Sequence, residues 1–129
     1  MRQEIAVDGF RLAYDRTGQG PRNPADRTGQ GPRNPADRTG QGPRNPAVLL
    51  LHGWPGDRTD YRDVAPLLAA AAGVIVPDLR GFGESDKHPA EPASQYTAAA
   101  QARSLIALIG ELGLSRPVIA GYDIGSRTR

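Results

Sequence analysis

The stretch Val118-Ile119-Ala120-Gly121-Tyr122-Asp123-Ile124-Gly125 does most to decide the fold of this chain. Its first three residues form an apolar run, which is typical of a strand buried on both faces of a parallel sheet. The spacing Gly-x-Asp-x-Gly that follows is that of a nucleophile elbow, a sharp turn from a strand into a helix. The alternative is that Asp123 only caps a helix that begins at Ile124. The backbone satisfies both interpretations, and the spacing alone does not choose between them.

Two further motifs also follow short apolar runs. His52-Gly53-Trp54-Pro55-Gly56 comes directly after Val48–Leu51, and the glycine-rich, charged stretch Asp78 to Asp86 comes after Val74–Val76. In parallel α/β sheets the functional site is built at the carboxyl ends of the strands. In the first motif, small residues allow a backbone N–H to point into a cavity, where it stabilises a negative oxygen, although a Gly-Pro turn explains the same residues in isolation. The second motif predicts a braced loop with a structural role. The joint placement of all three motifs favours Asp123 as a nucleophile.

The rest of the sequence alternates between strand-like and helix-like segments. A hairpin is predicted from Arg2–Val7 and Arg11–Tyr14, joined by the tight-turn pair Asp8-Gly9. Helices are predicted over Asp60–Ala72 and from an N-cap at Thr97 to Leu112, with Gly113 ending the second. Their apolar stripes are Val64, Leu67 and Leu68 in the first helix and Leu105, Ile106, Leu108, Ile109 and Leu112 in the second. The order strand, helix, strand, helix, strand predicts parallel βαβ units, and therefore an α/β fold with a mostly parallel sheet and flanking helices.

An identical eleven-residue unit, Asp-Arg-Thr-Gly-Gln-Gly-Pro-Arg-Asn-Pro-Ala, occurs three times in succession over residues 15–47. A solenoid is not expected, because the unit has no apolar face to bury against a neighbouring copy. We predict a disordered loop inside a single domain that spans residues 1–129. Each copy adds one net positive charge, so the formal net charge of +2 comes from the repeat. The basic balance therefore does not indicate a nucleic-acid partner.

The three motifs together resemble the α/β-hydrolase superfamily. His-Gly-Trp-Pro combined with Gly-Tyr-Asp-Ile-Gly-Ser-Arg is most similar to the epoxide hydrolase branch. The resemblance implies that Asp123 attacks an epoxide carbon and forms an alkyl-enzyme ester, while the backbone N–H groups of Trp54 and Ile124 form the oxyanion hole. His52, Gly53 and Pro55 would belong to the oxyanion loop, with a cis peptide between Trp54 and Pro55. A small-molecule epoxide substrate, no cofactor and no metal are implied.

In that family the fold continues well past the elbow, with further strands, a helical cap, an acid and a general-base histidine. We therefore expect an incomplete, N-terminal part of the hydrolase fold that is inactive alone. His52 and His88 are weak candidates for the base. Val118–Ala120 is expected to form an exposed sheet edge, which favours aggregation.

Other interpretations stay open. Haloalkane dehalogenases share the Asp nucleophile, but they commonly place a Trp after it to hold the halide, and Ile124 cannot donate such a hydrogen bond. An interaction protein whose Arg-containing repeat binds an acidic partner is a second alternative, and a fragment that pairs with a separate second half is a third.

Composition limits the covalent links, the metal sites and the cellular location that can be expected. The absence of cysteine excludes disulfides and thiolate metal sites. No signal peptide and no apolar stretch long enough to cross a membrane are recognised, so a cytoplasmic location without membrane or nucleic-acid partners is expected. The sequence makes no prediction of oligomeric state.

Overall fold

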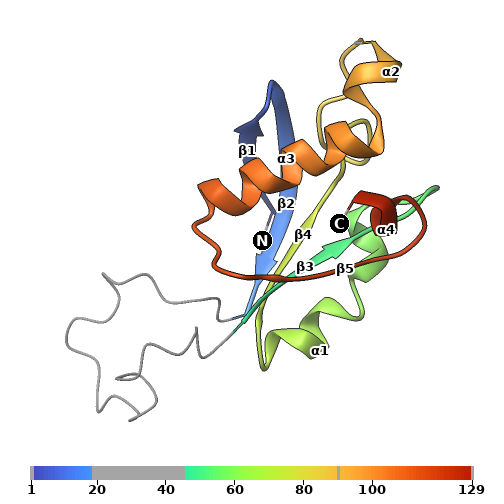
Figure 1. Cartoon of the computed structure of the whole chain (residues 1–129). Helices are drawn as coiled ribbons and strands as arrows, with labels where there is room; N and C mark the ends of the chain where they lie inside the picture. Colours follow the sequence, from blue (N-terminus) through green and yellow to red (C-terminus); the bar gives the residue numbers. More distant parts are fainter. Residues whose placement is uncertain (1, 19–45, 90, 129) are drawn as a thin grey trace.

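The computed structural model describes residues 2–18, 46–89 and 91–128. In this part of the chain five strands form one sheet in the order β1-β2-β4-β3-β5 (Figure 1). The strands are β1 (Arg2–Val7), β2 (Phe10–Thr17), β3 (Ala47–Leu51), β4 (Gly73–Pro77) and β5 (Val118–Gly121). β4, β3 and β5 run parallel to one another, while β1 and β2 add two antiparallel pairings. The predicted α/β fold is confirmed, in the form of a mixed sheet whose parallel part carries the motifs.

The hairpin at one edge forms where the sequence predicted it. Asp8 and Gly9 both have positive φ, at 49° and 80°, as the tight turns of two-residue hairpins require. β2 is longer than predicted, because it continues through Asp15–Thr17, the first residues of the repeat, and pairs there with β4. This part of the repeat is therefore strand rather than loop.

The two ends of the repeat lie at the same end of the sheet, where β3 and β4 begin. Ala47, its last residue, is the first residue of β3, and both Thr17 and Val48 lie opposite Val74. Residues 19–45, on which most of the loop prediction falls, lie outside the described residues. Because β3 and β4 begin at this end of the sheet, the repeat starts and ends far from their carboxyl ends.

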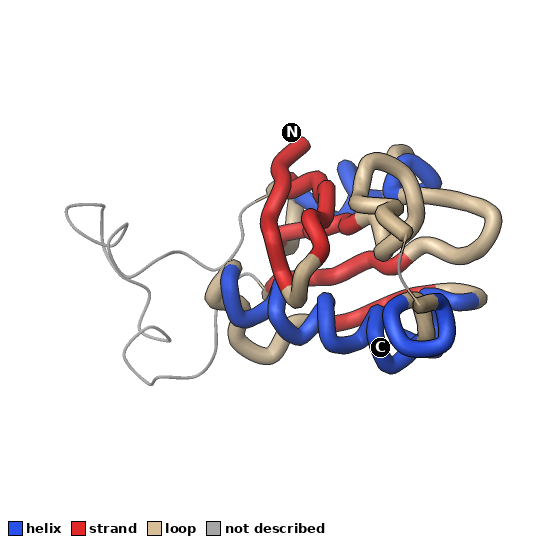
Figure 2. The backbone as a smooth tube through the Cα atoms, turned by 90° about the horizontal axis from the view of Figure 1, so that it is seen from above, coloured by secondary structure: helices blue, strands red, loops and turns tan. Residues whose placement is uncertain are grey.

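The core has two layers, one on each face of the sheet. Alternate side chains of β3 point to opposite faces: Leu49 and Leu51 pack into the cluster that includes Leu105 and Leu108 of α3 (Ala98–Glu111), while Leu50 packs with Ala65 of α1 (Ala65–Ala69). Figure 2 shows α3 running along one side of the strands. The two βα crossovers thus place one helix on each face.

The helix predicted over Asp60–Ala72 is wrong in its extent. The structure has a short 3-10 helix, η3 (Arg58–Tyr61), followed by the five residues of α1. Pro66 lies at the start of α1, where its missing N–H is tolerated, but the same ring prevents a helix from running through it from the preceding turn. The three apolar side chains expected to face the core are partly or largely exposed: Val64, Leu67 and Leu68.

The helix predicted from Thr97 is confirmed as α3. The Thr97 hydroxyl accepts a hydrogen bond from the N–H of Ala100 at 3.1 Å, and Gly113 follows the helix with φ 65°. Ile106 is an error in the predicted stripe, because it is 69% exposed. It lies between the core-facing Leu105 and Leu108, on the outer side of the helix. The sequence missed α2 (Pro92–Gln95), whereas α4 (Ile124–Thr128) begins where predicted.

Candidate active site

The turn from β5 into α4 has the geometry of a nucleophile elbow. Asp123 adopts φ 52°, in the left-handed region that few side chains occupy. A Cβ added to Gly125 would lie 2.5 Å from the Leu51 carbonyl oxygen, and one added to Gly121 would lie 2.8 Å from the Gly125 backbone. Both glycines are therefore required by the close approach of strand and helix, and the turn leaves Asp123 exposed.

The loop His52–Gly56, which the resemblance predicts to be the oxyanion loop and which is called by that name below, lies against the carboxyl group of Asp123. The backbone N–H of Trp54 donates to Asp123 Oδ2 at 2.9 Å. The pKa of the Asp123 carboxyl is held below its usual value, first by this bond and then by the N–H of Ile124. The two N–H groups assigned to the oxyanion hole from the sequence thus converge on the nucleophile candidate. The Trp54–Pro55 peptide is cis.

His52 is locked inside this loop. Its side chain is fully buried, Nε2 accepts a hydrogen bond from the N–H of Leu79, and Nδ1 lies 3.0 Å from the Gly53 oxygen. Because Nε2 accepts, Nδ1 must carry the proton and donate to Gly53. Neither nitrogen is left to take a proton from water, so His52 positions the loop and is not a general base.

His88 lies elsewhere. Its ring stacks on Phe10 of β2 with the ring centroids 4.2 Å apart, next to the hairpin. The two histidines are the only ones in the sequence, and neither hydrogen-bonds to Asp123. The structure therefore brings the nucleophile candidate and the Trp54 N–H together without a histidine bonded to the carboxyl group.

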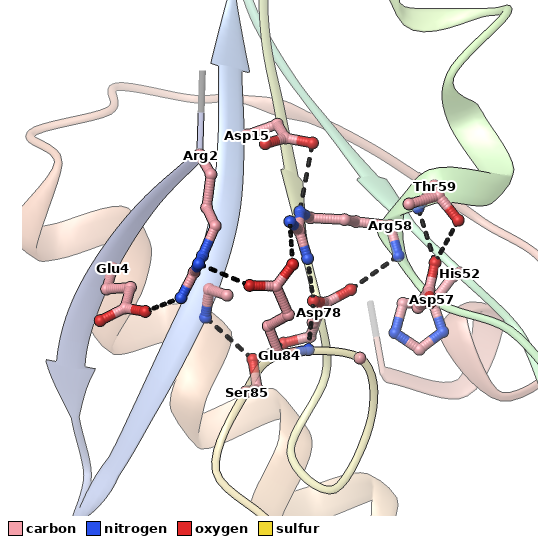
Figure 3. A network of polar contacts seen from close by, with 12 residues as sticks. Arg2, Glu4, Asp15, His52, Asp57, Arg58, Thr59, Asp78, Glu84 and Ser85 are labelled. Atoms are coloured by element: carbon pink, nitrogen blue, oxygen red, sulfur yellow. Dashed lines mark hydrogen bonds and ion pairs between the residues drawn. The ribbon is translucent and has the colours of Figure 1, made fainter.

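A buried ionic network holds the residues that follow the oxyanion loop (Figure 3). The Asp57 side chain caps η3 through the N–H of Thr59 at 2.8 Å. Next to it, the Arg58 guanidinium contacts Asp78 and Glu84, and its Nε lies 3.2 Å from Asp15. The hydrogen bond from Arg58 lowers the pKa of the Glu84 carboxyl.

Asp78 links this network to the second motif. Its two carboxylate oxygens accept from the N–H groups of Arg58 and Glu84 at 2.7 and 2.8 Å, and the side chain is fully buried. Arg80 is also fully buried; its guanidinium lies 4.2 Å from the Phe10 ring centroid and contacts Asp8 and Ser104. These contacts support the structural role that the sequence predicted for this stretch.

Sequence reasoning missed two residues of the site. Tyr122 directly precedes the nucleophile candidate, and its hydroxyl donates to Asp60 Oδ2 at 2.8 Å. The position of Tyr122 inside the elbow was the only signal in the sequence. Asp60 gave none, because it is predicted to lie in a helix.

The described part of the chain has no group of three or more His, Cys, Asp or Glu side chains placed to hold a metal. Within it, no helix is both long and apolar enough to cross a bilayer.

A mixed α/β sheet whose parallel strands lead into the loop His52–Gly56 and into a sharp turn centred on Asp123 is typical of α/β hydrolases. The sequence model described as "alpha/beta hydrolase fold" matches residues 46–128, and the chain belongs to this family.

Individual relatives agree with this assignment. A soluble epoxide hydrolase of Corynebacterium sp. is 37% identical over 60% of this chain and 26% of its own length. A fluoroacetate dehalogenase of Burkholderia sp. is 41% identical over 64% of this chain and 27% of its own. Among solved structures, a haloalkane dehalogenase from Bradyrhizobium elkani superposes with a TM-score of 0.71 and 30% identity, over 97% of this chain and 34% of that one. The chain thus spans about a quarter of the length of the curated relatives that it matches.

Proposed function

We propose that this chain carries the nucleophilic half of an epoxide hydrolase-like active site, in which Asp123 forms an alkyl-enzyme ester. The observation that carries the proposal is the 2.9 Å hydrogen bond from the Trp54 N–H to Asp123 Oδ2, made to a carboxylate held at φ 52°. A carboxylate that only capped a helix would need neither the strained turn nor a donor from a distant loop. Both features suit a side chain that must be presented and kept ionised.

The chemistry follows from this arrangement. Oδ2 is held by the backbone donor, which leaves the second carboxylate oxygen to attack carbon. A new C–O bond forms, the C–O bond of the epoxide breaks, and the released alkoxide takes a proton from water or an acid. In a later hydrolysis of the ester, the same N–H groups would stabilise the oxyanion of the tetrahedral intermediate.

The choice of electrophile rests on the residue after the nucleophile. The Ile124 side chain packs against the core cluster around Leu49 and Leu105, and it has no hydrogen-bond donor for a halide. This favours an epoxide, the substrate class named for the Corynebacterium relative. A dehalogenase-like reaction, in which a halide leaves instead, is the second candidate, supported by the fluoroacetate and haloalkane dehalogenase relatives.

Hydrolysis of the ester requires a base that the described residues do not place beside Asp123. His52 is engaged at both nitrogens and His88 packs on Phe10. We expect this chain to form the ester with a reactive epoxide but not to turn over. Release of the diol would belong to a longer protein that supplies a histidine.

The test compares two classes of electrophile, an epoxide and halogenated compounds, on the same chain. Incubation with styrene oxide should add the mass of one probe molecule to the intact protein, whereas fluoroacetate and 1-bromobutane should add nothing. Asp123→Asn should abolish the addition, since an amide is a poor nucleophile, and the intact mass also verifies that the Asn has not reverted to Asp. Addition to the Asn variant at the wild-type rate would refute Asp123 as nucleophile, and addition from the halogenated probes alone would favour the dehalogenase.

A further inference from the structure

We propose that Tyr122 and Asp60 form a positioning pair that sets the oxyanion loop onto the nucleophile. The inference deepens the proposed function and rests on it. The residues in question come from the two halves of the site: Tyr122 belongs to the elbow, and Asp60 belongs to η3, just after the oxyanion loop. Their hydrogen bond, 2.8 Å from the Tyr122 hydroxyl to Asp60 Oδ2, joins residues that are 62 positions apart in the chain.

Both side chains lie against the oxyanion loop. A Cβ added to Gly53 would lie 2.5 Å from Tyr122 Cε2, so the ring rests directly on the backbone one residue before Trp54. A Cβ added to Gly56 would lie 2.0 Å from Asp60 Oδ2, so the carboxylate rests on the backbone two residues after Trp54. The pair therefore contacts the loop on both sides of the N–H that binds Asp123.

A second tyrosine fixes the start of the same loop. The Tyr61 hydroxyl donates to the Leu51 oxygen at 2.9 Å, and its ring meets that of Tyr122 edge-on, with centroids 6.1 Å apart at 63°. The hydrogen bond to Asp60, more than any other cause, raises the pKa of the Tyr122 hydroxyl, as expected for a phenol that donates to a carboxylate. The Tyr122 ring is thus held by Tyr61 and Gly53, while its hydroxyl makes the link to η3.

The consequence concerns the Trp54 N–H. This N–H reaches Asp123 only if the spacing between the loop and the elbow is maintained. Tyr122 is the side chain that comes from the elbow and contacts the loop. Without its hydroxyl, the ring would still cover Gly53 and meet Tyr61 edge-on, but the hydrogen bond that ties Asp60 of η3 to the elbow would be lost. Trp54 would then move away from Asp123, and the carboxylate would lose its main donor.

The experiment follows the Asp123 carboxyl directly. Its pKa is measured by carbon-13 NMR titration in the wild-type chain, in Tyr122→Phe, which removes only the hydroxyl, and in Asp60→Ala, which removes the acceptor. Asp60→Asn is the conservative variant, because its amide oxygen still accepts from the phenol. Thr97→Ala, which removes the cap of α3 far along the chain, is the control for a general loss of stability.

The positioning role predicts that the pKa of Asp123 rises toward its ordinary value in Tyr122→Phe and Asp60→Ala, and that the Trp54 amide proton shifts upfield in both. Asp60→Asn and Thr97→Ala should leave both readings at wild-type values. An unchanged Asp123 pKa and Trp54 shift in Tyr122→Phe and Asp60→Ala would overturn the inference. Because the titration needs no substrate, its outcome is independent of whether any epoxide reacts.

The same variants also test whether the pair affects the rate at which Asp123 reacts with an epoxide. If the wild-type chain takes up styrene oxide, the rate in Tyr122→Phe should fall about tenfold or more, since a displacement of about 1 Å at a reacting group costs up to about a hundredfold. An unreactive wild-type chain with the predicted titration shifts would refute the proposed function while leaving the positioning pair in place. An unaltered labelling rate in both Tyr122→Phe and Asp60→Ala would count against the pair.

Discussion

Asp123 combines a strained backbone with a stabilised charge. Its φ of 52° costs of the order of 1 kcal/mol or more for a residue other than glycine, and the surrounding contacts of Gly121 and Gly125 hold it there. The N–H of Trp54 lowers the pKa of the carboxyl, so the side chain is ionised at neutral pH. Strain and charge together explain why this position can present a nucleophile.

The ionisation of Asp123 predicts the pH dependence of labelling. Only the carboxylate attacks, and its pKa is lowered in the folded chain, so the pH at which the rate of probe addition falls to half should lie below about 4, the ordinary pKa of an aspartate. The rate should fall as the pH decreases through the lowered pKa and the carboxyl becomes protonated. Initial labelling rates in a series of buffers check this. A rate that already halves near pH 6 would point to a different group.

Two glycines in contrasting surroundings test the packing of the elbow. Gly125→Ala would place a methyl group 2.5 Å from the Leu51 oxygen and 2.6 Å from the His52 oxygen, and should lower the free energy of unfolding by about 1–3 kcal/mol. Gly110→Ala, in α3 with nothing within 4 Å of the added Cβ, should raise it by about 0.5–1 kcal/mol because alanine is the better helix former. Urea unfolding followed by circular dichroism measures both, and equal effects at the two sites would contradict the close approach.

Site residues within a local motif could be predicted from the sequence, whereas residues that meet only in the folded sheet could not. Asp123 was predicted from motif spacing, whereas Trp54 and Ile124 were predicted from the resemblance alone. Asp60 and Tyr122 meet only when the ends of β3 and β5 are brought together by the sheet. No local pattern encodes such a contact.

The elements were predicted best where one rule dominated. The hairpin with Asp8-Gly9 and the capped helix α3 follow from turn and capping chemistry. The segment after the oxyanion loop was predicted poorly, because its shape depends on the buried contacts of Arg58 with Asp78 and Glu84. Apolar periodicity did not show that these contacts hold η3, or that Pro66 separates η3 from α1.

The strand β5 is an open edge of the sheet. Among the described strands it pairs on one side only, with β3, and its first residue, Val118, is 55% exposed. An open edge with apolar side chains promotes pairing between chains. Val118→Lys should therefore reduce light scattering of concentrated samples at 37 °C, whereas Ile106→Lys, at a more exposed apolar position on α3 (69%), should reduce it less. An equal reduction at both positions would assign the effect to general hydrophobicity rather than to the strand edge.

At the scale of the whole molecule, the repeat is connected to the fold at points distant from the site. Thr17 and Ala47 lie at the edge where β3 and β4 begin, while the oxyanion loop and the elbow follow the ends of β3 and β5. Because the copies are identical, removal of two of the three leaves the same residues joined to both strands. The length of the repeat can thus change without altering either anchor.

Deletion of Asp26–Ala47 should accordingly leave the fold intact and raise the free energy of unfolding by about 1 kcal/mol, through a smaller entropy of loop closure. The control replaces residues 20–41, a stretch of equal length that leaves both anchors in place, by a Gly-Ser segment, and this variant should match the wild type. Thermal and urea unfolding measure the difference. A destabilised deletion variant would show that the additional copies contribute contacts of their own.

The central claim is that Asp123 is the nucleophile, and peptide mapping after labelling tests it most directly. The chain is treated with styrene oxide, digested and analysed by tandem mass spectrometry, with Asp123→Asn in parallel. The account predicts one adduct, an ester on Asp123, in the wild type and none in the variant. An adduct on another carboxylate such as Asp60, or no adduct in a folded wild-type chain, would contradict it.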